Sequence, residues 1–150
     1  ELLDTAGKYF RKSMKNRSER IELEIGTVDA KVIGDLNQLR FLLENLIDEA
    51  LAVHEDGLLR LQARQDDEYI RFLFTDTRRE KSMEELNLLF YPNLARMTSG
   101  EKGELRGTEY LVCKQIIRDH DEFAGRRGCR INAEPAADGG FTVYFTVPRR

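Results

Sequence analysis

Two polar residues on a predicted long helix have the type and spacing to bind a metal ion or a charged ligand. Asn45 and Glu49 lie four positions apart, so their side chains share one helix face and can point into one pocket. A carboxylate such as that of Glu49 supplies the oxygen ligand that Mg²⁺ prefers. Solvent-facing residues on a surface helix would give the same pattern, so the spacing alone leaves both interpretations open.

Asp76 is a third candidate, because it stands at the end of a predicted strand. The residues before it, including Phe72 and Phe74, alternate with polar ones in the manner of a half-buried strand. An aspartate in this place can contact a ligand, but it can equally begin a turn. Its position makes Asp76 a candidate without deciding between the two roles.

A long helix is predicted to carry the first pair of residues. Asp35 is a favourable N-cap, and Gln38 completes a capping-box pattern three positions later. The helix is expected to run to about Val53. Its apolar face consists of Leu36, Leu39, Leu43, Leu46, Ile47 and Ala50.

The other elements are expected to surround this helix. We predict further helices over 2–17, 82–90 and 108–119, strands over 20–25 and 30–33, and a polar loop over 93–106. Two antiparallel hairpins are predicted, one from 59–63 and 70–74 and one from 129–133 and 141–147. This order predicts an α+β fold, a two-layer sandwich with helices on one face of a mixed, mostly antiparallel sheet. We expect 1–18 to be an amphipathic helix leading in from an upstream region and 19–150 to form the domain.

Composition narrows the classes of partner. The chain has 150 residues and a net charge of −3, which gives no general attraction to nucleic acid or to an anionic membrane. No apolar run is long enough to span a membrane, so we expect no direct membrane contact and a cytoplasmic location. Cys113 and Cys129 have no metal-ligand spacing, and Cys113 is expected to be a small buried residue. His54 and His120 are expected to be surface or cap residues.

Three passages, in this order, resemble motifs of the ATP-binding domain of sensor histidine kinases. That domain belongs to the GHKL family, which also includes gyrases, mismatch-repair ATPases and heat-shock ATPases. Residues 45–50 resemble its N box, residues 76–80 resemble its D-x-G-x-G box, and residues 107–114 resemble the glycine-rich turn that leads out of the ATP lid. The resemblance covers about 21–148, nearly the whole chain.

The resemblance implies roles for the three candidates. Asn45 matches a residue that lies near the phosphates or takes the place of a catalytic base. Glu49 stands where the family has its magnesium-binding asparagine. Asp76 stands where the family's aspartate accepts a hydrogen bond from the adenine amino group.

The resemblance also implies a ligand and partners. Gly107 and Thr108 match the turn whose backbone amides bind phosphates at a helix N-terminus. Arg96 or Lys102, in the predicted lid, could reach those phosphates. The implied cofactor is Mg-ATP. The implied partners are the dimerisation and phosphoacceptor helices of the parent protein and a response regulator.

The chain departs from the family where the ligand would be touched. Arg78 and Glu80 replace two glycines of the second box, and Glu109 and Leu111 replace two glycines of the third. Large side chains there would crowd the adenine pocket or force another loop path, and Glu109 would compete with a bound anion. We therefore predict a sensor kinase domain with weak or lost Mg-ATP binding and autophosphorylation. The alternative is a pseudo-kinase interaction module that signals through protein contacts without nucleotide.

Overall fold

The computed structural model describes residues 2–26, 32, 34–66, 68–87, 109–123, 130–137 and 139–149. Its elements are α1 (Leu2–Ser13), β1 (Ile21–Gly26), α2 (Leu36–Leu51), β2 (Gly57–Gln65), β3 (Tyr69–Asp76), α3 (Met83–Asn87), α5 (Glu109–Phe123), β4 (Ile131–Pro135) and β5 (Phe141–Pro148). The predicted loop over 93–106 lies outside the described residues, as does Cys129.

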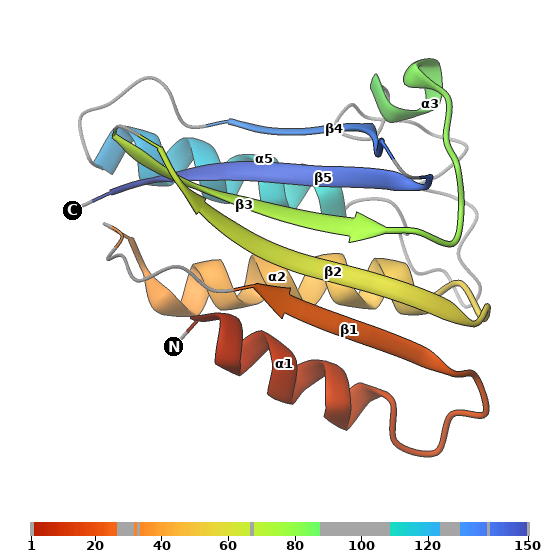
Figure 1. The fold of residues 1–150 in the computed structure, drawn as a ribbon. Coiled ribbons are helices and arrows are strands. Elements are labelled where there is room, and N and C mark those ends of the chain that lie inside the picture. The colour runs from red at the N-terminus through yellow and green to blue at the C-terminus, as the bar shows by residue number, and fades with distance from the viewer. Residues whose placement is uncertain are drawn as a thin grey trace, which may run out of the picture.

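The strands form one five-stranded sheet in the order β1-β2-β3-β5-β4. Strand β1 is parallel to β2, and the other neighbouring strands are antiparallel. The antiparallel pairs include both predicted hairpins, β2 with β3 and β4 with β5. Helices α2 and α5 run side by side behind the sheet, and α1 lies along α2 next to β1 (Figure 1). The predicted α+β sandwich with a mixed, mostly antiparallel sheet is confirmed.

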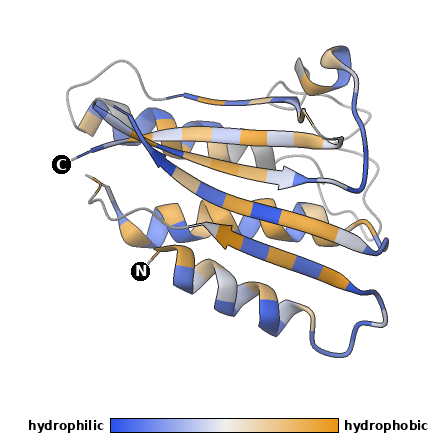
Figure 2. Cartoon of the chain, in the orientation of Figure 1, coloured by the Kyte–Doolittle hydropathy of each residue, from blue (hydrophilic) through white to orange (hydrophobic). Residues whose placement is uncertain are grey.

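The hydrophobic core lies between the sheet and these helices. Apolar and polar residues alternate along β1 and β2, as period-two strands with one buried face require (Figure 2). The α2 residues Leu39, Leu42, Leu43 and Ile47 are at most 1% exposed. Burying each such side chain stabilises the fold by about 1.5–3 kcal/mol. The predicted apolar face therefore anchors the helix that carries Asn45 and Glu49, with two differences: Leu36 is 43% exposed, and Leu42, which was not predicted, is buried.

Three element boundaries differ from the prediction. Helix α1 ends at Ser13, and Asn16 follows with a left-handed φ of 67°, which a helix cannot continue through. Helix α5 extends to Phe123, because its last turn packs against the start of α2 through His120. Of the strand predicted over 30–33, only Val32 is described, in an isolated bridge to Arg149. No helix in the described ranges is long and apolar enough to cross a membrane.

Helix α1 is fixed to α2 by an apolar face and by one polar contact. Leu3, Ala6 and Phe10 are buried in the common core. On the solvent side, the Tyr9 hydroxyl donates a hydrogen bond of 2.6 Å to Asp48 Oδ1. Partial burial, followed by this hydrogen bond to a carboxylate, raises the pKa of Tyr9 to about 12.

Tyr9 should therefore make stability depend on pH in the alkaline range. The folded chain keeps the Tyr9 proton up to about pH 12, whereas the unfolded chain loses it near its ordinary pKa of about 10. The contribution is complete below pH 10 and is lost as the pH rises towards 12. The tyrosinate absorbance difference between the native chain and Tyr9→Phe should show a step near pH 12, shifted downward in Asp48→Asn. A step near pH 10 in the native chain would contradict the contact.

Candidate functional site

A cavity of about 290 Å³ lies between the C-terminal half of α2 and the end of β3. We call it the α2–β3 cavity. Its described lining residues are Leu46, Glu49, Ala50, Ala52, Val53, Phe74, Asp76, Arg79, Lys81, Phe141 and Val143. The cavity brings together Glu49 and Asp76, which are 27 positions apart in sequence.

The folding of α2 and β3 determines where the candidate residues stand. Asp76 is 4% exposed at the last position of β3, where Gly140 of the β4–β5 turn comes close to its backbone. Glu49 is half-buried on α2 and lines the α2–β3 cavity. Asn45 is half-buried one turn earlier and is not among the described lining residues. Lys102, Gly107 and Thr108, like Arg96, lie outside the described residues, so their roles stay predictions.

The carboxylate of Asp76 is engaged by its near neighbour Arg78. Arg78 donates from Nε to Oδ1 and from Nη2 to Oδ2, both at 2.9 Å, and its backbone N–H donates to Oδ1 at 3.0 Å. The two side chains are 1% and 5% exposed, so this is a buried bidentate ion pair. Three of the roughly four acceptor positions of the carboxylate are thereby occupied.

The remaining donors of Arg78 bind carbonyls at the C-terminal end of α2 and in the segment just after it. Nη1 donates to the carbonyls of Val53 and Glu55, at 3.0 and 2.9 Å, and Nη2 donates to the carbonyl of Ala50. Together with the bonds to Asp76, these contacts use all five side-chain N–H groups of the guanidinium. Carbonyls at a helix C-terminus lack partners within the helix and carry partial negative charge, so they favour a cation. Arg78 therefore joins β3 to α2.

A glycine makes room for this arrangement. Gly57, the first residue of β2, has a φ of 151°, and a Cβ atom there would lie 2.4 Å from Cγ of Arg78. Any other residue would collide with the arginine. Arg78 is absent from the described lining of the α2–β3 cavity. The position of this side chain therefore differs from the predicted crowding: it lies against the end of α2 and neutralises Asp76.

A second arginine holds the same end of α2. Arg17 donates to the carbonyl of Leu51 at 2.8 Å and pairs with Glu19 at 3.3 Å. His54 also contacts Glu19, and its side chain is 67% exposed, which confirms the surface position predicted for it. Hydrogen bonds from the backbone and from His54 lower the pKa of Glu19. The C-terminus of α2 is thus capped by protein side chains from two different segments.

The wall of the α2–β3 cavity also carries two basic side chains among its apolar residues. Arg79 pairs with Glu55 at 3.4 Å, and both side chains are about half exposed. The Lys81 ammonium lies 5.5 Å from the centre of the Phe141 ring, within range of a cation–π contact. Two basic side chains therefore line the α2–β3 cavity together with Glu49 and Asp76.

Glu49 is the residue that the resemblance assigns to metal binding. No group of three or more His, Cys, Asp or Glu side chains that could hold a metal ion occurs among the residues that the structure describes. The assignment of Glu49 as a metal ligand stays a prediction.

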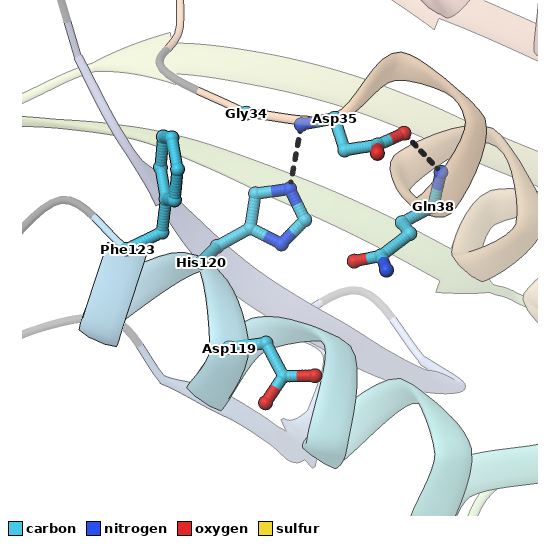
Figure 3. A pocket seen from close by; sticks show the side chains of 6 residues that line it. All are labelled: Gly34, Asp35, Gln38, Asp119, His120 and Phe123. Atoms are coloured by element: carbon cyan, nitrogen blue, oxygen red, sulfur yellow. Dashed lines mark hydrogen bonds between the residues drawn. The ribbon is translucent and has the colours of Figure 1, made fainter.

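A larger cavity, of about 400 Å³, lies at the other end of α2, away from the candidate site residues. Figure 3 shows His120 of α5 beneath the start of α2, where its Nε2 accepts a 2.9 Å hydrogen bond from the Asp35 N–H. Asp35 caps α2 as predicted, with its carboxylate accepting from the N–H groups of Asn37 and Gln38. The second bond of the predicted capping box is replaced, because His120 takes the Asp35 N–H in place of the Gln38 side chain.

His120 is predicted to be a surface or a cap residue, and of these two the surface position is wrong. Its side chain is 4% exposed, and its Nδ1 lies 2.8 Å from the carbonyl of Ile116 on its own helix. The ring therefore bridges α5 and α2 from a buried position. Cys113 on the same helix is completely buried, as predicted.

Arg78 is the functional residue whose role the sequence did not indicate. One signal was available: a charged side chain two positions after a buried aspartate, in a slot where the resembled family has glycine, needs a buried partner. An Asp76 side chain that accepts the N–H two residues later also forms a common turn. The partners on α2 are 23 to 28 positions away in sequence, and no local pattern marks them.

The chain is similar to known proteins of one kind. A family model described as histidine kinase-, DNA gyrase B-, and HSP90-like ATPase matches residues 34–150. The signal transduction histidine-protein kinase BaeS of Escherichia coli K12 is 26% identical over 151 residues, which cover 98% of this chain and 30% of BaeS. The chain thus spans about a third of the length of that relative.

Three solved structures have a similar fold. The mycobacterial sensor histidine kinase MprB matches with a TM-score of 0.73 and 20% identity, over 98% of this chain and 93% of that one. A nucleotide-free catalytic domain of the histidine kinase ThkA matches with a TM-score of 0.75 and 19% identity, over 99% of this chain and 90% of that one. ThkA has also been solved in complex with the response regulator TrrA, and 40% of that ThkA chain is covered at a TM-score of 0.72.

Proposed function

The chain belongs to the family of histidine kinase-, DNA gyrase B- and HSP90-like ATPases, and from this premise we propose a degenerate sensor-kinase domain. It is the catalytic, ATP-binding domain of a two-component sensor histidine kinase, and its binding of Mg-ATP is weak or lost. The likeness to BaeS over nearly the whole chain supports the kinase assignment. The state of Asp76 supports the loss of binding.

The ion pair between Asp76 and Arg78 is the observation that carries this proposal. In the family that the chain resembles, the matching aspartate accepts a hydrogen bond from the adenine amino group. Here the same carboxylate accepts three hydrogen bonds from Arg78, and its charge is neutralised in a buried place. An adenine that claimed these oxygens would have to break a buried ion pair, and leaving one partner unpaired costs about 3–5 kcal/mol. That cost is comparable to the whole binding energy of a millimolar ligand, about 4 kcal/mol.

The position expected for the metal supports the same conclusion. Glu49 lines the α2–β3 cavity at the position that the resemblance assigns to the metal ligand, and a carboxylate near a triphosphate repels it unless a cation lies between them. The described residues therefore fit poorly with Mg-ATP held in the manner of the family.

The partners proposed for the domain are those of a sensor kinase. These are the dimerisation and phosphoacceptor helices of the parent protein and a response regulator. The complex of ThkA with TrrA supports the second partner, since the ThkA chain in it shares this fold. The alternative function, an interaction module that works without nucleotide, is favoured by the capping of α2. Two arginines of the chain satisfy the end of that helix, so the folded state needs no ligand at this place.

A nucleotide titration tests the proposal. A fluorescent ATP analogue should bind with a dissociation constant above about 1 mM, with or without Mg²⁺, because Asp76 is occupied. The melting temperature should likewise stay unchanged at millimolar ATP. The same titration on Asp76→Asn serves as the control, since it removes the carboxylate that adenine would need. Submillimolar binding that Mg²⁺ strengthens and Asp76→Asn abolishes would show a working adenine site and would sink the proposal.

A further inference from the structure

A groove between α5 and the edge strand β4 is positively charged although the chain as a whole is acidic. The α5–β4 groove, of about 350 Å³, is lined by Lys114, Ile117, Arg118, Arg130, Ile131, Asn132 and Tyr144. Three of these residues are cationic, and none of the described lining residues is acidic. The net charge of the chain is −3, so the α5–β4 groove departs from the average of the surface.

The two arginines of the α5–β4 groove are available to a ligand. Arg118 on α5 and Arg130 just before β4 are both exposed. Within the described part of the chain, neither guanidinium has a hydrogen-bond or ion-pair partner. A third arginine, Arg71, lies beside the groove with its guanidinium 5.5 Å from the centre of the Tyr144 ring. Arginine is the side chain best shaped to bind carboxylates through two parallel hydrogen bonds.

The α5–β4 groove offers one accessible aliphatic residue among its polar walls. Ile131 is partly exposed and packs on the core, whereas Ile117 is 1% exposed and adds no free surface. An apolar side chain placed here would bury surface, while groups on either side of it would reach the cationic rim. This combination favours a ligand that carries both carboxylates and an apolar residue.

Strand β4 itself is protected against the addition of another strand. The amide of Ala133 is already bonded, at 2.9 Å, to the side-chain oxygen of Asn132. Helix α3 lies against β4, beside one end of the strand in Figure 1. Covered edges of this kind resist backbone pairing. Recognition at this place therefore has to use side chains.

From these observations we propose that the α5–β4 groove binds an acidic segment of a partner protein that carries an apolar anchor residue. The anchor packs on Ile131, and its neighbouring carboxylates pair with Arg118 and Arg130. Nucleic acid fits less well, because its recognition needs a longer basic stripe than this groove offers. The net charge of −3 also disfavours a polyanionic ligand. The groove lies on α5 and β4, so its binding does not depend on the state of Asp76.

A labelled peptide of glutamates around one central leucine tests this proposal. Its affinity is measured by fluorescence anisotropy at low salt and at about 0.15 M salt. Arg118→Glu combined with Arg130→Glu should weaken binding by about tenfold or more. The matched control, Arg40→Glu with Arg64→Glu, makes the same change in net charge at two exposed positions outside the groove and should weaken it by about threefold or less. Circular dichroism checks the fold of each variant, and Arg118→Gln with Arg130→Gln gives a milder second pair.

Several outcomes separate this proposal from simple charge attraction. Chemical-shift changes in the native chain should gather on α5 and β4, and a glutamine version of the peptide should not bind. Equal weakening in both double glutamate variants would overturn the proposal, because only net charge would then matter. Tighter binding of an oligothymidylate than of the peptide would assign the groove to nucleic acid. Absence of peptide binding at low salt would likewise refute the site.

Discussion

Replacement of Arg78 by methionine should lower the free energy of unfolding by about 3–5 kcal/mol, the cost of breaking a buried ion pair by removing one partner. Methionine keeps much of the volume of the arginine stem but leaves the carboxylate of Asp76 buried without its counter-ion. It also leaves the carbonyls of Ala50, Val53 and Glu55 without the donors that now cap α2. Both losses act on the same two elements, so β3 and α2 should loosen together.

Urea unfolding followed by circular dichroism measures the Arg78 effect, and the neighbouring arginine provides the control. Arg79 has a half-exposed side chain paired with an equally exposed Glu55, so Arg79→Met should change stability by no more than about 0.5–1 kcal/mol. The double variant Asp76→Asn with Arg78→Met should lose less than the sum of the single losses, with a coupling of about 1–3 kcal/mol. An Arg78→Met chain as stable as Arg79→Met would mean that the buried pair does not hold the fold.

Alanine at Gly140 should cost about 2–4 kcal/mol, the second-largest loss that we expect for a single substitution. Gly140 has a φ of 79°, and a Cβ atom there would lie 2.0 Å from the carbonyl oxygen of Asp76 and 2.7 Å from Cα of Thr77. Neither atom belongs to a flexible side chain. The end of β3 would therefore have to shift, and Asp76 would shift with it.

Gly139 supplies the comparison that separates backbone strain from collision. It also has a positive φ, 102°, but a Cβ atom there would meet no other atom within 4 Å. Gly139→Ala should therefore cost only the conformational strain, about 1 kcal/mol. The Arg78 Nε–H resonance should move in Gly140→Ala and stay in place in Gly139→Ala. Equal losses from the two substitutions would contradict the close approach of Gly140 to β3.

Local patterns predicted the elements well because each of them depends on near neighbours in the sequence. The apolar face of α2, the Asp35 cap and the alternating strands are all encoded within a few residues. Ser82 and Glu85 likewise form a capping box at the start of the helix predicted over 82–90, with Ser82 Oγ accepting from the Glu85 N–H at 3.1 Å. The predicted sheet class followed from the order of these elements.

Contacts between distant elements could not be predicted in the same way. The position of His120 under Asp35 joins residues 85 apart, and only the packing of α5 on α2 brings them together. The partners of Arg78 on α2 have the same origin. For the site, the resemblance indicated that Glu49 and Asp76 share one cavity, but it gave Asp76 an adenine partner in place of a guanidinium. No local pattern in the sequence indicates which of these two partners, adenine or the Arg78 guanidinium, the Asp76 carboxylate binds.

The fit between Gly57 and Arg78 limits which sequences this chain can reach by single changes. A chain with glycine at position 78 would lose the guanidinium. The buried carboxylate of Asp76 would then lack its counter-ion, and the carbonyls at the end of α2 would lose the hydrogen bonds from Arg78. A chain with a larger residue at position 57 would expel the arginine with the same result. Each residue is therefore tolerated only in the presence of the others. A change to glycine at position 78 would therefore need coordinated substitutions at Asp76 and around the end of α2, and we expect the single-step intermediates to be the least stable members of the series.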